Sequence, residues 1–170
     1  GEKNKLSPKK DFFRLYENGI KNCIPLLGGQ FNDVKNINTY FLMMDFDKAG
    51  IKYSSTIGSK LISENKVVRI CNNKKDPDDL TRPEIISAIK TSEDFIDWYI
   101  NKIFKYEDSI EHKLNVLEEV SKLLVNNKKE NVVLYSDKIA KRLRLPLGVV
   151  VAHISIITPN YKDIFKEFNN

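Results

Sequence analysis

The feature that most constrains the fold is a strongly amphipathic segment from Ile110 to Val125. Its apolar side chains recur every three or four positions, at Leu114, Leu117, Val120 and Leu124. This spacing places them on one face of an α-helix. A helix with a single apolar face has to bury that face against other elements. We therefore predict a helix here and a fold built mainly by the packing of helices.

Helix-start signals predict two further helices before this segment. The first begins at Thr81 and Pro83, residue types that favour the start of a helix. Its buried positions are expected to be Ile85, Ile86 and Ile89. The second follows a Thr91-Ser92 start and covers Phe95–Phe104. One side of it carries Phe95, Trp98, Tyr99 and Ile103. An apolar stripe at this spacing is usually core or interface, not a cofactor pocket.

The first part of the chain is also predicted to be largely helical. Residues 1–10 are rich in lysine and lack core residues, so we expect a flexible lead followed by a short helix that ends at Gly19. Apolar residues between 37 and 49 recur near helical spacing, and Gly50 follows where a helix would end. Residues 54–65 are predicted to form another short helix.

Extended structure is predicted at only two places. Residues 66–71 alternate β-branched and basic types, which indicates a strand or a solvated arm, and residues 72–80 form a loop. Residues 132–134 are a short β candidate. After them, Ser136 is expected to cap a helix that Pro146 interrupts before a second helix begins. That spacing over residues 136–157 is typical of a helix-turn-helix.

Together these patterns predict a mainly α fold, a helical bundle-like single domain with at most one or two short β segments. We expect this domain to span residues 11–170, with a helix-turn-helix-like subregion at 132–170. A chain of 170 residues is long enough to bury a core of its own. No apolar run suits a membrane helix and no secretory signal is evident, so we expect a cytoplasmic protein without a membrane partner.

The two cysteines favour neither a disulfide framework nor a cysteine-only metal site. Cys23 and Cys71 lie far apart in the sequence and form no CxxC motif. Free cysteine is commonly buried among apolar neighbours. We expect both thiols to be reduced.

The charge distribution favours a polyanionic partner. The net charge of +5 divides into +4, −2 and +3 over residues 1–60, 61–110 and 111–170. The candidate nucleic-acid contacts are Lys35, Lys48, Lys52, Lys60, Arg69 and Arg82. Arginine suits phosphate best because its planar fork can bind two oxygens. The alternative is that these side chains form an ordinary solvated surface.

Base reading by residues 136–157 is a weaker possibility. A recognition helix needs polar side chains that reach base edges, and residues 147–157 offer only His153 and Ser155. A packed helical hairpin is therefore the better interpretation, although basic residues before the turn could contact phosphates. These are Lys138, Lys141, Arg142 and Arg144. A histidine on an apolar helix is more often a hydrogen-bonded core residue than an acid-base group.

Asp45 and Asp47 are a possible metal-binding pair, since a DxD on a strand can hold divalent ions for nucleotidyl transfer. In the helix predicted for residues 37–49, the two carboxylates would instead diverge by about 200°. The acidic loop of Asp76, Asp78 and Asp79 lacks the glycine and closing glutamate of an EF-hand. On these grounds we predict no catalytic residue and no metal site.

The stretch GIKNCIPLLGGQFNDVKNINTYFLMMDFDKAGI, residues 19–51, resembles the C-terminal domain of the primase large subunit. In that family a segment with a cluster-ligand cysteine precedes a polar linker, an aromatic-rich helix and a closing Gly-hydrophobic pair. Cys23 stands at a position resembling the first cluster cysteine. Two cysteines cannot hold a four-cysteine iron–sulfur cluster. The resemblance therefore points to a cluster-free relative, similar to the small noncatalytic third subunit of certain archaeal primases, with no cofactor.

The resemblance implies a noncatalytic role in DNA replication. Such a subunit would bind single-stranded template DNA and the initiating nucleotide triphosphate, in complex with the primase catalytic and large subunits. Tyr40 and His153 join the basic residues as candidate nucleic-acid or nucleotide contacts, while Thr39 stands where many family members have arginine. Two alternatives stay open: a helix-turn-helix duplex DNA regulator, and a structural domain whose Trp98 stripe docks another chain.

Overall fold

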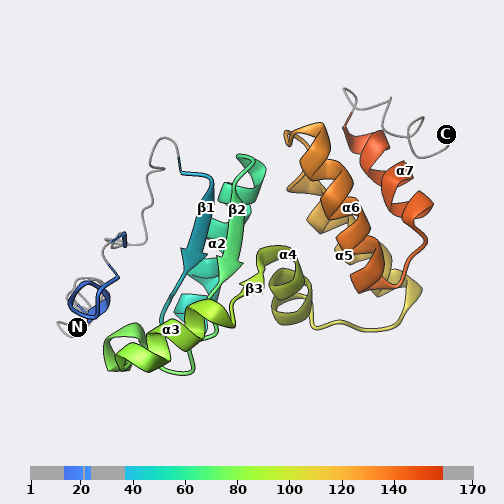
Figure 1. The fold of residues 1–170 in the computed structure, drawn as a ribbon. Helices are drawn as coiled ribbons and strands as arrows, with labels where there is room; N and C mark the ends of the chain where they lie inside the picture. Colours follow the sequence, from blue (N-terminus) through green and yellow to red (C-terminus); the bar gives the residue numbers. More distant parts are fainter. Residues whose placement is uncertain (1–13, 21, 24–36, 159–170) are drawn as a thin grey trace. The chain divides into compact units, whose positions relative to one another are not determined.

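The fold is described from a computed structural model, which places residues 14–20, 22–23 and 37–158. Within these residues it is mainly α, as predicted (Figure 1). The longer helices are α2 (Lys48–Ser63), α3 (Arg82–Lys90), α5 (Ile110–Lys122), α6 (Lys129–Leu143) and α7 (Leu147–Ile157). Shorter ones are the 3-10 turn η3 (Pro77–Asp79), α4 (Phe95–Trp98) and the π-helical turn η4 (Tyr99–Ile103). The predicted lead, residues 1–10, lies outside the described residues.

The chain divides into two compact units. Unit 1 contains residues 1–58 and 69–93, and unit 2 contains residues 59–68 and 94–170. The boundary passes through α2 and through the second strand of a small sheet, so both elements contribute to both units. We had predicted a single domain over residues 11–170.

The sheet of three strands has the order β1-β2-β3. Its strands are β1 (Thr39–Leu42), β2 (Val67–Ile70) and β3 (Glu93–Asp94). The arrows of β1 and β2 point the same way in Figure 1, and α2 connects them, as a crossover between parallel strands requires. At the ends of these strands, the amide of Cys71 donates to the carbonyl of Leu42 at 2.9 Å. Of the two alternatives for residues 66–71, the strand is confirmed.

The predicted helix at residues 37–49 is wrong, because its first half is β1 and its second half is a loop before α2. In β1 the side chains of Tyr40 and Leu42 are buried, while Thr39 and Phe41 are exposed. This alternation has the period of a strand, and β-branched and aromatic residues favour the extended backbone. The helical spacing in the sequence came from joining apolar residues of the strand to those of the next helix.

Gly50 lies in the first turn of α2 and does not end a helix. A Cβ atom at this position would lie 1.8 Å from the carbonyl oxygen of Asp45. Glycine is needed here because the β1–α2 loop packs directly on the helix backbone. Asp47 begins the helix: its Oδ1 accepts a hydrogen bond from the Gly50 amide at 2.7 Å. The helix predicted over residues 54–65 therefore starts earlier, at Lys48.

The helix predicted at Thr81 and Pro83 is confirmed as α3, and Thr81 caps it by accepting from the Glu84 amide. Its buried residues are Ile85 and Ala88, whereas Ile86 is 36% exposed and Ile89 is half-buried, contrary to our expectation. Residues three apart share one helix face, and Ile86 is rotated by about 100° from Ile85.

The helix predicted over Phe95–Phe104 is confirmed over Phe95–Ile103, although only its first four residues are α-helical. It begins with Asp94, which accepts from the Ile96 amide at 2.9 Å, and not with Thr91-Ser92. After four residues it passes into the π-helical turn η4. Its aromatic side is core, as predicted, since Phe95 and Trp98 are buried and the rings of Phe95 and Tyr99 stack at 5.2 Å.

Unit 2 is built chiefly from α5, α6 and α7, which pack on one another. Buried residues on these helices include Val116, Leu117, Val120, Val132, Ile139, Leu143, Val150, Val151 and Ile154. The helix predicted at Ile110 is confirmed and begins at the cap Ser109, although Leu114 is 50% exposed. Among the described helices, none has the length and apolar content needed to cross a membrane.

The β candidate at residues 132–134 and the cap at Ser136 are both wrong, because α6 begins at Lys129 and contains them. Ser136 is buried, and its hydroxyl donates to the carbonyl of Val132 at 2.6 Å. The buried positions of α6 recur at helical spacing. The two-helix pattern with an interrupting Pro146 is confirmed: α6 ends at Leu143, its C-cap Arg144 has a φ of 52°, and α7 starts after the proline.

Candidate metal site

The predicted basic residues differ in their exposure and in their contacts. Arg69, on β2, is half-buried, and its Nε donates to the Ser92 hydroxyl at 2.9 Å. Its Nη2 also donates to the Ser92 carbonyl. These contacts tie the side chain of Arg69, and with it strand β2, to the segment that precedes β3.

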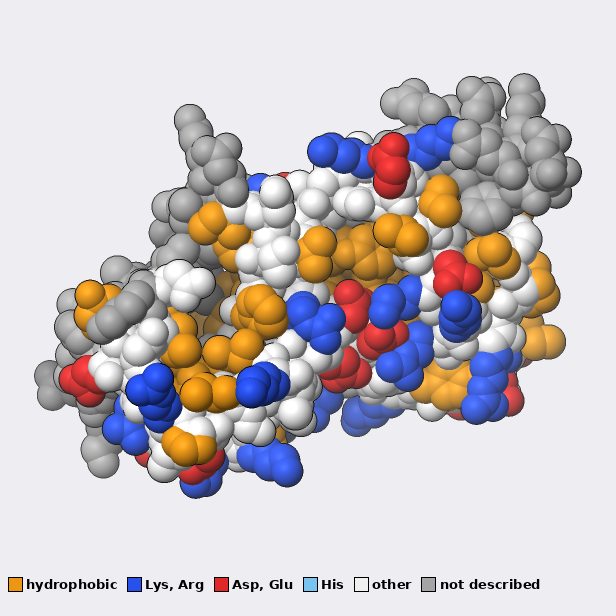
Figure 2. Space-filling model, viewed as in Figure 1, with side chains coloured by type: hydrophobic (Ala, Val, Ile, Leu, Met, Phe, Trp, Pro, Cys, Tyr) orange, Lys and Arg blue, Asp and Glu red, His pale blue; other side chains and the backbone are white. Residues whose placement is uncertain are grey.

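The other described basic candidates are exposed. Lys48, Lys52 and Lys60 lie on α2, and Arg82 is the first residue of α3. Lys48 and Lys52 are one turn apart, so they share a face of the helix. Lys35 lies outside the described residues. On the face of the molecule in Figure 2, basic side chains are interspersed with acidic and uncharged ones and form no continuous stripe.

The two remaining candidates are not on an open surface. Tyr40 is only 8% exposed. His153, on α7, is half-buried, and its Nε2 has no hydrogen-bond partner among the described residues.

The basic residues of α6 are paired with carboxylates within unit 2. Asp97 accepts from Lys138 at 2.8 Å and from Arg142 Nε at 2.6 Å, and Lys141 pairs with Asp137 at 2.8 Å. Burial would raise the pKa of Asp97, but the hydrogen bonds from Arg142 and Lys138 hold it below its usual value. These side chains line an open groove of about 430 Å³. Because Lys138 and Arg142 share Asp97, they lose much of their value as phosphate contacts.

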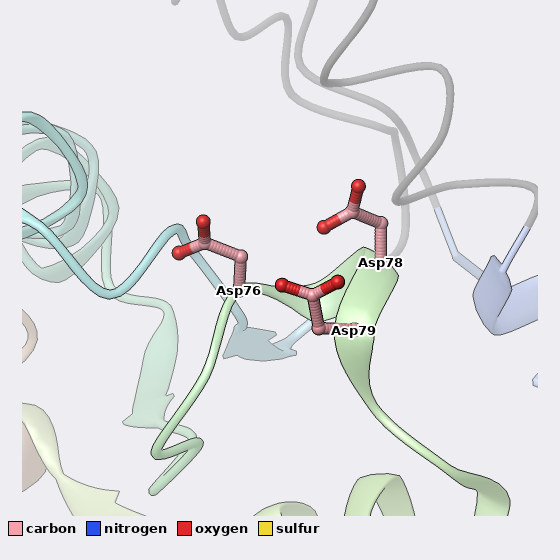
Figure 3. Close-up of side chains that lie close together, drawn as sticks. All are labelled: Asp76, Asp78 and Asp79. Atoms are coloured by element: carbon pink, nitrogen blue, oxygen red, sulfur yellow. The ribbon is translucent and has the colours of Figure 1, made fainter.

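A group of three aspartates does converge, in unit 1. Ligand oxygens of Asp76, Asp78 and Asp79 all lie within 4.8 Å of one another. The three residues belong to the loop after β2, where Pro77 opens the 3-10 turn η3. Figure 3 shows their carboxylates on the same side of this turn. Among the described residues this is the one group of three or more possible ligands that meets at such distances.

The loop after β1 is bonded to this acidic loop. The Phe46 amide donates to Asp76 Oδ1 at 2.7 Å. Next to it, Asn73 Nδ2 donates to the carbonyl of Met44 at 2.8 Å and to that of Lys75 at 3.0 Å. The DxD pair flanks Phe46 in sequence, so Asp45 and Asp47 adjoin the loop that carries Asp76.

The topology explains why these loops meet. Because β1 and β2 are parallel neighbours, their carboxyl ends lie at the same edge of the sheet. Ligands of open α/β sheets bind outside the carboxyl ends of the strands. We call the DxD pair together with Asp76, Asp78 and Asp79 the acidic edge.

The acidic edge has the chemistry of a magnesium or calcium site. Hard divalent cations prefer carboxylate oxygens, and Mg²⁺ binds them at about 2.1 Å, so two of its ligand oxygens lie at most about 4.2 Å apart. The 4.8 Å limit of the aspartate group therefore needs only small side-chain rotations. Asp76 Oδ1 and Asp47 Oδ1 already accept backbone amides, at 2.7 Å each, which orients both carboxylates.

Our reason for dismissing the DxD pair is thus overturned. It assumed that Asp45 and Asp47 lie within a helix, whereas they lie in the loop between β1 and α2. The missed signal was the alternation of TYFL, which indicates a strand that ends at Leu42, with two residues between it and Asp45.

Comparison of the chain with protein-family models, with curated proteins and with solved structures gave no significant match.

Proposed function

We propose that this chain acts in a DNA primase, where its acidic edge binds a divalent cation and, through it, the triphosphate of a nucleotide. The observation that carries the proposal is the bond from the Phe46 amide to Asp76, which joins the two aspartate loops at the carboxyl ends of parallel strands. A cation at this edge would convert an anionic surface into one that binds phosphate.

The start of α2 supports phosphate binding beside the cation. The helix begins directly after Asp47, and its aligned peptide dipoles give this end a partial positive charge. Lys48 and Lys52 follow on one exposed face. They offer a path for a nucleic-acid backbone that leads away from the acidic edge.

The assignment to a primase combines this site with the family resemblance of residues 19–51. Where the resemblance implied an aromatic-rich helix, the structure has β1 and a loop. The proposal therefore rests more on the acidic edge than on the resemblance. In the accessory role that we expected, the chain would hold template and initiating nucleotide for the catalytic and large subunits. A cation bound here would anchor the triphosphate in that complex.

A second candidate function is nucleotidyl transfer at the acidic edge itself. Asp76, Asp78 and Asp79, whose oxygens converge, would hold one ion, and the DxD pair on the loop bonded to Asp76 would hold the second. A two-ion site stabilises both the attacking and the leaving oxygen of a phosphoryl transfer. The aspartates would hold the ions, and Lys48 would stabilise charge on the phosphates.

Nucleotide binding and primer synthesis test both candidates. The chain should bind ATP in the presence of Mg²⁺ and lose binding in EDTA, and an Asp76→Asn Asp78→Asn variant should show the same loss. Adding the chain to a catalytic and large primase subunit pair should restore initiation under the accessory role. Template-dependent synthesis by the chain alone would instead support the second candidate.

A control variant distinguishes specific loss from misfolding. Glu111→Gln changes an exposed carboxylate on α5 and should leave ATP binding unchanged. If the wild-type chain binds neither Mg²⁺ nor ATP and does not affect primer initiation, both candidates are refuted.

A further inference from the structure

We propose that Phe46 is a stacking residue for a nucleobase at the acidic edge. This inference rests on the proposed function and adds to it the part of the nucleotide that the aspartates cannot recognise. Phe46 is 63% exposed, the most exposed aromatic side chain among the described residues. It lies between the two aspartates of the DxD pair, on the loop bonded to Asp76.

The backbone around Phe46 is held in place by several independent contacts. Its own amide donates to Asp76 Oδ1 at 2.7 Å, and Met44 accepts from the buried Asn73 at 2.8 Å. On the other side, Asp47 caps α2, and Gly50 allows the helix to approach the carbonyl of Asp45. The backbone that carries this exposed ring is therefore held in place, which lowers the entropy cost of binding a ligand.

The combination of groups fits a nucleotide better than a bare phosphate. Carboxylates and a cation bind the phosphate end, while an aromatic ring binds the flat face of a base by stacking. Every base has a π-face, so this contact would be tolerant of sequence. The chemistry is shared by a free nucleotide and by a base of a single strand.

Binding measurements on the full chain test the role of Phe46. With Mg²⁺ present, Phe46→Ala should lower the affinity for ATP by roughly 5- to 100-fold, the range that loss of base–aromatic stacking produces. Its affinity for inorganic tripolyphosphate, which has no base, should stay within about twofold. Phe46→Trp should retain ATP binding, because the larger ring still stacks.

A second pair of probes separates the two sources of the base. An oligothymidylate and the same oligomer with abasic sites should differ in their sensitivity to Phe46→Ala if the base belongs to a single strand. If only ATP is sensitive, the base belongs to the free nucleotide.

The matched control is Phe41→Ala. Phe41 is a 48% exposed phenylalanine on β1, outside the acidic edge, and its loss should leave the affinity for ATP unchanged. Equal losses for ATP and tripolyphosphate in Phe46→Ala, or no loss for ATP and for either oligomer, would overturn the stacking role while leaving cation binding intact. Absence of Mg²⁺-dependent tripolyphosphate binding in the wild type would instead refute the proposed function.

Discussion

Replacing Gly50 by alanine should displace the loop that carries the DxD pair. The added Cβ would lie 1.8 Å from the Asp45 carbonyl oxygen and 2.7 Å from its carbonyl carbon. Real Cβ contacts essentially never fall below 3.0 Å, so the separation must rise from 1.8 Å to at least 3.0 Å, a shift of at least 1.2 Å. Both clashing groups are backbone, and a rotamer change cannot relieve the contact.

A shift of this size would break contacts that now fix the loop. The hydrogen bonds Gly50 N to Asp47 Oδ1 and Phe46 N to Asp76 Oδ1 are each 2.7 Å long, and stretching either by about 1 Å leaves no useful bond. Loss of one of these bonds costs about 1 kcal/mol, and overpacking adds about 1–3 kcal/mol. We therefore expect Gly50→Ala to lower the free energy of unfolding by about 2–4 kcal/mol.

Thermal and urea unfolding followed by circular dichroism would measure this loss. In a chain of this size, about 2–4 kcal/mol corresponds to a drop in Tm of about 5–15 °C. The matched control is Gly148→Ala on α7, where an added Cβ meets nothing within 4 Å. That change should raise stability by about 0.5 kcal/mol, since alanine favours a helix over glycine. A Gly50→Ala variant as stable as the wild type would refute the close packing of loop and helix.

Two further predictions concern titratable groups. Asp97→Asn should lower the free energy of unfolding by about 1–3 kcal/mol at neutral pH, because Lys138 and Arg142 lose a charged acceptor. The pKa of Asp97 in the folded chain lies below its usual 3.8. The difference in stability between variant and wild type should therefore vanish as the pH falls through that lower pKa. Urea unfolding across this pH range would show it, and a difference that grew on acidification would contradict the assignment. Burial raises the pKa of the Cys71 thiol to about 12, and the nearby charge of Arg69 lowers it by less than burial raises it. This thiol should therefore stay protonated at pH 8 and react with a thiol reagent only when the chain unfolds. The half-buried Cys23 should react sooner, and a Cys23→Ser variant that still reacts fast would refute the burial of Cys71.

The helical part of the fold could be predicted from the sequence because its signals are local. The helices at Thr81 and Ile110 were found from capping residues and from apolar spacing over three or more turns. The π-helical turn after Trp98 could not be found this way, because the sequence there keeps an ordinary helical stripe.

The acidic edge could not be predicted because it depends on pairing between strands far apart in the chain. β1 has only four residues, and its alternation was masked by the apolar residues that follow it. Once β1 and β2 are parallel neighbours, the two aspartate loops must lie at the same edge. The contact of Arg69 with Ser92 likewise joins residues far apart in the sequence, so sequence patterns could not indicate it.

The most direct test of the acidic edge is Mn²⁺ binding to the full chain, measured by electron paramagnetic resonance or calorimetry. The wild type should bind Mn²⁺, and Mg²⁺ should compete for the same site. An Asp78→Asn Asp79→Asn variant should bind about tenfold more weakly or worse, whereas the control Glu111→Gln should bind as the wild type does. A wild type that binds no Mn²⁺, or a double variant with unchanged affinity, would contradict the account.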